Sequence, residues 1–268
     1  MKKALLLLVA AVLLAGSWST SARAEAGALS GEVGIDYASR YIWRGLDLIE
    51  DNNPAIQPWA TVGYGLTDKL SISYLFWADY RLVSGSDREG DDAENDWDEF
   101  DHVVTLTYEM DDTWSFDLGY IYYSLPSVSG SNAEEVYGGA TMALPYNLST
   151  SLYVYYQFDS GNPYGTYTKW TVDYSRALTE FAEVSASVGL GYMHYNRTYG
   201  GEDFDSGLSD LPLSMGLSFD LGKGVSAKIS ANYSFSLDAL EDNQFEPGGS
   251  DYNDKDEAWL MTGLSYSF

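Results

Sequence analysis

The chain has 268 residues, of which 40 are acidic and 14 basic, and its formal net charge is −26. Nucleic acid is therefore a poor partner, because the Lys and Arg clusters that neutralise phosphates are missing. The sequence contains no cysteine, which excludes a disulfide framework and a thiolate metal site. The 23 tyrosines and 8 tryptophans instead suit the two aromatic belts of a membrane protein.

The first 24 residues have the features of a secretory signal peptide. Lys2 and Lys3 form a positive start, and an apolar run follows over 4–15. This run is shorter than the roughly 20 apolar residues that a membrane-spanning helix needs. A small-residue site, Ala22-Arg23-Ala24, comes next, so we predict cleavage after residue 24 and a single mature domain over 25–268.

From residue 32 onward, long segments alternate apolar and polar side chains. The expected strands are 32–44, 55–65, 70–82, 99–110, 114–125, 134–144, 148–159, 167–176, 182–195, 210–220, 225–238 and 257–268. Ten or so residues can cross a bilayer at a tilt, whereas ordinary strands span about five or six. The pattern predicts an all-β fold: an antiparallel up-and-down transmembrane β-barrel of about 12 strands.

The connections between these strands alternate in length. Short turns are expected at 66–69, 111–113, 145–147, 177–181 and 221–224, and longer polar loops at 45–54, 83–98, 126–133, 160–166, 196–209 and 239–256. Short periplasmic turns and long outer loops are typical of outer-membrane barrels. We therefore expect the chain in the cell outer membrane of a Gram-negative bacterium, with both termini periplasmic.

Aromatic side chains cluster near both ends of the expected strands. Those near the periplasmic ends are Tyr64, Trp114, Phe181, Phe219, Tyr266 and Phe268; those near the outer ends are Tyr41, Trp43, Tyr80, Tyr122, Phe158, Trp170, Tyr192 and Phe235. Such girdles lie at the two interfaces of a membrane. The core of a soluble sandwich would place the aromatic residues in the middle of the strands.

The first expected hairpin carries a distinctive series of short motifs. They are Asp36-Tyr37, Ser39-Arg40-Tyr41, Trp43-Arg44-Gly45 and Pro54-Ala55-Ile56-Gln57. Over about thirty residues this hairpin resembles the TorF-type outer-membrane porins, and Trp43 and the Leu-Asp-Leu at 46–48 are variants of the pattern. The resemblance implies a small barrel with a role in transport.

Charged residues on the inward face of the strands are candidates for a constriction of the lumen. If Tyr37, Tyr41 and Trp43 face outward, Arg40 and Arg44 face inward. The full candidate set is Asp36, Arg40, Arg44, Asp79, Arg81, Asp117, Lys169, Asp173 and Lys228. Rings of charged side chains orient and select solutes in channels. The same residues could alternatively form a salt-bridged plug that only holds the barrel together.

The size of the barrel limits what could pass. Eight strands leave an interior filled by side chains and sixteen to eighteen leave a wide channel, so about twelve predict a narrow pore. Bulky inward residues are expected at Leu75, Trp77, Tyr123, Tyr153, Tyr155 and Trp259. With the excess of inward acids, this predicts a porin-like channel for passive diffusion of small cationic or neutral solutes. The alternative is a non-conducting structural or surface-interaction barrel whose acidic loops bind divalent cations.

The acidic run in 83–99 is the candidate for such binding. Asp92, Glu94, Asp96 and Asp98 alternate, so in an extended chain they share a face and could hold a hard cation through oxygen. A second acidic stretch spans 251–257. Neither has the Gly and terminal Glu of an EF-hand loop, so a plain solvated acidic loop is the competing interpretation. Bridging of divalent cations to lipopolysaccharide phosphates is a third.

Nothing in the sequence predicts an enzyme, a catalytic residue or a cofactor. The two histidines, His102 and His194, are expected near the outer interface. A twelve-stranded outer-membrane phospholipase is similar in size and strand count only, since its His-x-Ser arrangement is absent here. A nucleophile needs a base that a third group orients, and no such set is evident.

The last strand ends on an aromatic residue. Ala258, Leu260, Thr262, Leu264, Tyr266 and Phe268 fall on one face of it. A terminal Phe on such a strand resembles the signal that outer-membrane barrels present to their assembly machinery. The expected partners are this machinery, outer-membrane lipids and lipopolysaccharide, and small solutes or ions.

Overall fold

The computed structural model describes residues 25–48, 53–82, 97–126, 132–159, 162–194, 206–241 and 256–268. The predicted signal peptide lies outside these residues. Twelve long strands form the wall of the molecule: β1 (Leu29–Ala38), β4 (Ala55–Thr67), β5 (Leu70–Arg81), β6 (Trp97–Glu109), β7 (Trp114–Ser124), β8 (Asn132–Leu144), β9 (Leu148–Asp159), β10 (Asn162–Ala177), β11 (Ala182–His194), β13 (Asp210–Gly222), β14 (Val225–Ser236) and β15 (Glu257–Ser267).

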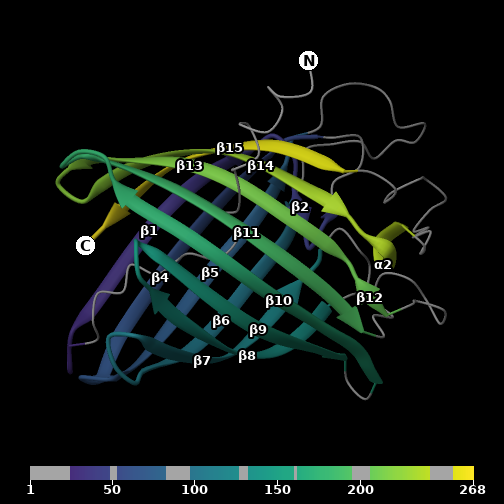
Figure 1. Ribbon diagram of the computed structural model, residues 1–268, viewed down its shortest axis with the longest axis horizontal. Coiled ribbons are helices and arrows are strands. Elements are labelled where there is room, and N and C mark those ends of the chain that lie inside the picture. Colours follow the sequence, from purple (N-terminus) through teal and green to yellow (C-terminus); the bar gives the residue numbers. More distant parts are fainter. Residues whose placement is uncertain are drawn as a thin grey trace.

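Each long strand pairs antiparallel with its neighbours in the chain, and β1 pairs with β15 to close the sheet. The result is a closed, tilted barrel (Figure 1). The sequence prediction of a twelve-stranded antiparallel β-barrel is therefore confirmed. Closure matters because it leaves no unpaired sheet edge in the wall.

Shorter elements lie at the end of the barrel opposite the C-terminus, which we call the loop end (Figure 1). β12 (Gly207–Leu208) adds two pairs to β11, and α2 (Asp238–Glu241) follows β14. β2 (Ile42–Trp43) and β3 (Leu46–Asp47) form a separate two-stranded hairpin. We call the other end, where the connections are short, the short-turn end. Within the described part of the chain, every helix is too short or too polar to cross a membrane.

The two faces of the wall alternate as the sequence predicts. On β15, Leu260 and Leu264 are 53% and 54% exposed on the outer surface, while Trp259, Met261 and Ser265 line the interior. The same alternation on β14 exposes Val225, Ile229 and Phe235 and buries Ser230, Asn232 and Ser234. Successive side chains of a β-strand point to opposite faces of the sheet, which accounts for the apolar outer face and the polar inner face.

Three inward aromatic rings lie flat against the wall. A Cβ added at Gly34, Gly119 or Gly139 would lie 2.2–2.3 Å from the ring of an inward residue on the next strand of the barrel. The rings are those of Trp59, Tyr137 and Tyr153, respectively. Because the glycines let these rings approach the backbone closely, the rings occupy less of the lumen than their size suggests.

The first strand is shorter than predicted, and the chain after it turns into the barrel. β1 ends at Ala38, and residues 42–47 form the β2–β3 hairpin, which we call the lumen hairpin. Its two central residues, Arg44 and Gly45, have φ values of 51° and 83°, as a two-residue primed turn requires. The expected strand over 32–44 is therefore wrong beyond Ala38.

This turn also corrects the predicted orientation of two aromatic residues. Tyr41 and Trp43 were expected on the outer face, but both lie inside. The Tyr41 hydroxyl donates to Glu99 Oε2 at 2.9 Å, and Trp43 packs against a buried cluster. That cluster contains Leu46, Tyr167, Met193, Ala239 and Leu240. This cluster gives the aromatic ring of Trp43 an apolar environment inside the barrel.

Candidate functional site: the barrel lumen

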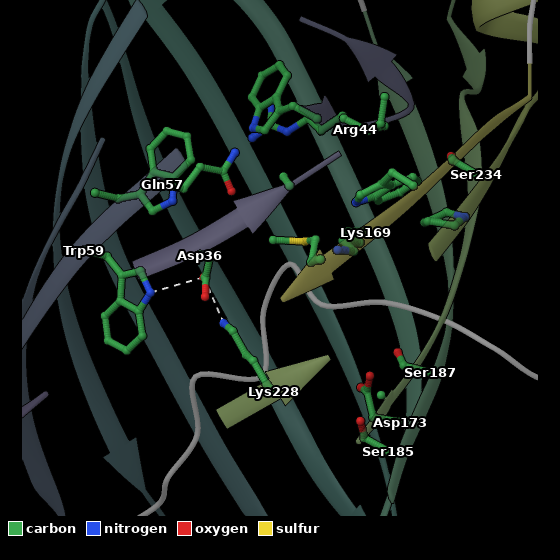
Figure 2. Close-up of a pocket in the computed structure, with 18 of the residues that line it drawn as sticks. Asp36, Arg44, Gln57, Trp59, Lys169, Asp173, Ser185, Ser187, Lys228 and Ser234 are labelled. Carbon is green, nitrogen blue, oxygen red and sulfur yellow. Dashed lines mark hydrogen bonds and ion pairs between the residues drawn. The ribbon is translucent and has the colours of Figure 1, made fainter. Parts of the chain in front are cut away.

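A cavity of about 750 Å³ occupies the interior of the barrel. At the short-turn end it is lined by Asn147, Ser149 and Ser265, and at the loop end by Arg44 and Gly45 of the lumen hairpin. Figure 2 shows that its lining residues project from several strands of the wall. The cavity thus reaches from one end of the barrel to the hairpin.

Both signs of charge line this cavity. Its acidic residues are Glu32, Asp36, Asp101, Asp173, Glu183 and Asp210, and its basic residues are Arg40, Arg44, Lys169 and Lys228. Of the predicted constriction residues, six are among these: Asp36, Arg40, Arg44, Lys169, Asp173 and Lys228. Asp79, Arg81 and Asp117 lie outside the lining of the cavity.

Asp36 and Lys228 form an ion pair on the inner face of the barrel wall. Lys228 Nζ lies 2.9 Å from Asp36 Oδ2, which also accepts a hydrogen bond from Trp59 Nε1 at 3.2 Å (Figure 2). The two charged residues come from β1 and β14, and Gly263 of β15 lies between them in register. A Cβ at Gly263 would be 1.9 Å from Asp36 Oδ1, so only glycine leaves room for the pair.

A second polar group lies where β4, β5 and β6 meet. Gln57 Nε2 donates to Asp79 Oδ1 at 2.8 Å, and Asp79 is fully buried. Asp79 is opposite Glu99 in the β5–β6 register, and Glu99 accepts the hydrogen bond of Tyr41. Burial and then the neighbouring carboxylates raise the pKa of Tyr41 well above its ordinary value, so its hydroxyl remains a donor.

Arg44, at the tip of the lumen hairpin, makes the most extensive contacts of the predicted site residues. Its Nη1 and Nη2 atoms lie 2.8 and 2.7 Å from the two carboxylate oxygens of Glu135 on β8. The Arg44 guanidinium carbon also lies 4.8 and 4.5 Å from the ring centroids of Tyr155 and Tyr167, and 4.1 Å from that of Trp43. Tyr123 donates to Glu135 at 2.9 Å.

Because β8 and β9 lie opposite β1 in the barrel order, Arg44 ties the hairpin to the far wall. Its side chain is 8% exposed and that of Glu135 is 1% exposed, so the pair is almost fully withdrawn from solvent. Removing one partner of such a pair leaves a buried charge, which is strongly unfavourable. The lumen hairpin is therefore held firmly across the loop end.

Two further arginines pair nearer the loop-end rim. Arg40 pairs with Glu257 at the start of β15, and Arg81 pairs with Asp98 at the start of β6. Asp98 was a candidate metal ligand, but its carboxylate here meets a guanidinium. Its proposed companions Asp92, Glu94 and Asp96 lie outside the described residues.

The remaining predicted residues bind neighbouring side chains. Asp117 accepts hydrogen bonds from Thr107 at 2.6 Å and from Tyr153. Asp173 accepts one from Thr171 at 2.8 Å. Lys169 lines the cavity on the wall that also carries Asp173 (Figure 2).

Glu135 and Asp210 were not among the predicted site residues, yet they are two of the most buried acids of the lumen, with 0% and 1% exposure. Glu135 could have been found, since it falls between outward-facing residues of an expected strand. Asp210 accepts hydrogen bonds from Tyr167 and Ser209, but it starts a strand after a long loop. The alternation of apolar and polar residues does not indicate there whether the Asp210 side chain faces inward or outward.

No group of three or more His, Cys, Asp or Glu residues that could hold a metal occurs in the part of the chain that the structure describes. The two histidines are on the surface. The Tyr74 hydroxyl is 2.7 Å from His102 Nδ1, and Ser206 Oγ is 2.9 Å from His194 Nδ1. The second contact is a serine–histidine pair that the sequence spacing did not indicate.

No protein-family model matches this sequence, and no curated protein matches it. Its fold is similar to solved outer-membrane barrels. The KdgM porin is 11% identical with a TM-score of 0.50, covering 88% of this chain and 99% of that one. The NanC porin is 12% identical with a TM-score of 0.50 and a coverage of 89% and 99%. An outer membrane channel from Pseudomonas putida F1 is 11% identical with a TM-score of 0.56, and coverage is 91% and 96%.

At this level of identity the likeness concerns the fold. It spans nearly the whole of each protein, and the three similar structures are porins or channels of the outer membrane. The chain therefore shares the closed antiparallel β-barrel fold of these proteins.

Proposed function

We propose that this protein is an outer-membrane channel for the passive diffusion of small cationic or neutral solutes. The observation that carries this proposal is the charged, water-compatible cavity that extends through the barrel from the short-turn end to the lumen hairpin. The porin-type fold supports it. The excess of acidic over basic residues in the lining supports a preference for cations.

The same proposal assigns the constriction to the loop end. There the lumen hairpin brings Arg44 to Glu135 and Gly45 to Asp210, and Arg40, just before the hairpin, pairs with Glu257. Asp36, Lys169, Asp173 and Lys228 lie below as a charged lining, and Asp79, Arg81 and Asp117 support the surrounding wall. A field across the lumen from such groups would orient and select solutes.

The proposed function also implies a location and an orientation for the barrel. We place it in the outer membrane with both termini of the mature chain in the periplasm and the exposed aromatic residues at the lipid headgroups. Its last strand, ending at Phe268, would engage the barrel assembly machinery. The motifs from Asp36 to Gln57 support a TorF-type porin, although part of that segment lines the lumen rather than crossing the membrane.

A non-conducting barrel is the second candidate, and the lumen hairpin favours it. A tip held by a buried Arg44–Glu135 pair could close the loop end and leave the acidic outer loops to bind divalent cations or lipopolysaccharide. If so, calcium should raise the melting temperature and protect the segment 83–96 from proteolysis. Absence of both effects would remove the cation-binding part of this candidate.

Single-channel recording of the refolded protein in a planar bilayer under a salt gradient tests the main proposal. We expect discrete conductance steps with a reversal potential on the cation-selective side. Anion selectivity would contradict the solute preference, and a folded but silent barrel would favour the second candidate.

A further inference from the structure

The tip of the lumen hairpin holds an arginine where its backbone favours other residues. Arg44 has a φ of 51° and precedes Gly45 in a two-residue primed turn. Asn, Asp and Gly are the usual residues there, because φ is positive at both central positions. The turn itself therefore does not require arginine, and its side-chain contacts must offset the unfavourable backbone conformation.

Those contacts are made with a site that belongs to the wall. Glu135 is on β8, Tyr155 on β9, Tyr167 on β10 and Tyr123 on β7. The Glu135 carboxylate is fully buried and takes a hydrogen bond from Tyr123. These four residues would remain in place if the hairpin moved, because none of them depends on the hairpin for its position in the sheet.

The chemistry of this wall site matches a planar organic cation. A carboxylate with both oxygens available accepts two parallel hydrogen bonds from a guanidinium group. Tyrosine faces next to that carboxylate add cation–π attraction, which is stronger where water is excluded. When Arg44 leaves, the Glu135 carboxylate and the tyrosine faces remain on the wall, and both attract another cation to the vacated position.

We propose that Glu135, Tyr123, Tyr155 and Tyr167 form a binding site for a small guanidinium-bearing solute, and that Arg44 is its tethered occupant. A free guanidinium group competes with Arg44, displaces the tip of the lumen hairpin and so opens the loop end. The second step rests on the proposed channel function, whereas binding at the wall does not.

The test uses guanidinium chloride, at millimolar concentrations far below denaturing ones, on the refolded full barrel in detergent. Arg44→Asn removes the resident guanidinium and keeps a residue that suits the turn. We expect guanidinium to raise the melting temperature of this variant saturably, with NaCl at equal ionic strength giving no such rise. In the matched control Arg44→Asn with Glu135→Gln, the half-saturating concentration should increase by about tenfold or more.

A second measurement uses the unmodified chain and does not depend on how the variant folds. Guanidinium should accelerate cleavage by chymotrypsin after Trp43 several-fold, because the displaced tip becomes accessible, and NaCl should not. Melting and cleavage that respond equally to guanidinium and NaCl would overturn the proposal. Binding at the wall in a barrel that never conducts would refute the channel and leave the site standing.

Discussion

The two ends of the lumen are built on the same sheet but filled differently. Toward the short-turn end, the cavity is lined largely by small polar side chains such as Ser149, Ser185, Ser218 and Ser265. At the loop end, aromatic rings and buried charges surround the lumen hairpin. Among the described residues, the wall leaves an open interior, and the hairpin between β1 and β4 crosses that interior at the loop end.

This contrast separates two kinds of stabilisation. The wall is held by a closed ladder of backbone hydrogen bonds, which local changes in side chains disturb little. The hairpin depends on a few side-chain contacts, chiefly those of Arg44 and Tyr41. Substitutions that remove contacts of the lumen hairpin should therefore change the conductance. Substitutions that overpack the wall should instead lower the stability of the barrel.

The largest effect is expected from Glu135→Ala. It leaves Arg44 buried without its carboxylate, a loss of about 3–5 kcal/mol for a pair of this kind. The hairpin should leave the wall to relieve this penalty, which would raise the single-channel conductance. The matched control is Asp98→Ala, which breaks the Arg81 pair nearer the rim and should leave conductance nearly unchanged. Equal conductance in the two variants would show that the hairpin does not obstruct the lumen.

Gly263→Val should act on the wall instead. Its Cβ would lie 1.9 Å from Asp36 Oδ1 and 2.7 Å from Lys228 Cε, so the ion pair must separate or the strands must shift. Overpacking of this kind costs about 1–3 kcal/mol. The free energy of unfolding in urea should fall, with Gly138→Val as control, since a Cβ there meets only a backbone oxygen at 3.7 Å. Equal losses for both variants would refute the special role of Gly263.

Tyr41→Phe should weaken the base of the hairpin. It leaves the buried Glu99 carboxyl group without this donor, and an unsatisfied buried polar group costs about 1–3 kcal/mol. Most of this loss should appear as faster chymotryptic cleavage after Trp43, because the wall does not depend on Tyr41. Tyr64→Phe on the exposed outer surface is the control and should leave that rate unchanged. A lower unfolding free energy without faster cleavage would contradict this assignment.

Most of the wall could be predicted from the sequence, because each strand that separates lipid from water must alternate. Strands such as β14 and β15 accordingly start and end close to the predicted residues. The lumen hairpin could not be predicted in this way. Tyr41 and Trp43 continue the alternation of Tyr37, and Arg44-Gly45 is an unusual turn sequence.

The contacts between side chains within the lumen were even harder to predict from the sequence. The alternation along each strand shows which side chains face the lumen, and for this reason Asp36, Lys169 and Lys228 were identified as lining residues. Which charges meet depends on the register between strands and on a chain segment that crosses the barrel. Arg44 and Glu135 are 91 residues apart, and no local pattern links them.

Neutralising one partner of the Asp36–Lys228 pair at a time gives the smallest expected effect, and it tests the open part of the lumen by itself. Lys228→Met leaves Asp36 as a net negative charge on the cavity wall, and Asp36→Asn leaves Lys228 as a positive one. A unit charge near water changes the energy of an ion at about 4 Å by roughly 1 kcal/mol, or about fivefold in permeability ratio. The two variants should shift the reversal potential in opposite directions, the first toward cations. Because the pair lies below the hairpin, the shifts should persist in the background of Glu135→Ala. Shifts that vanish there would instead mean that ions are selected at the loop end alone.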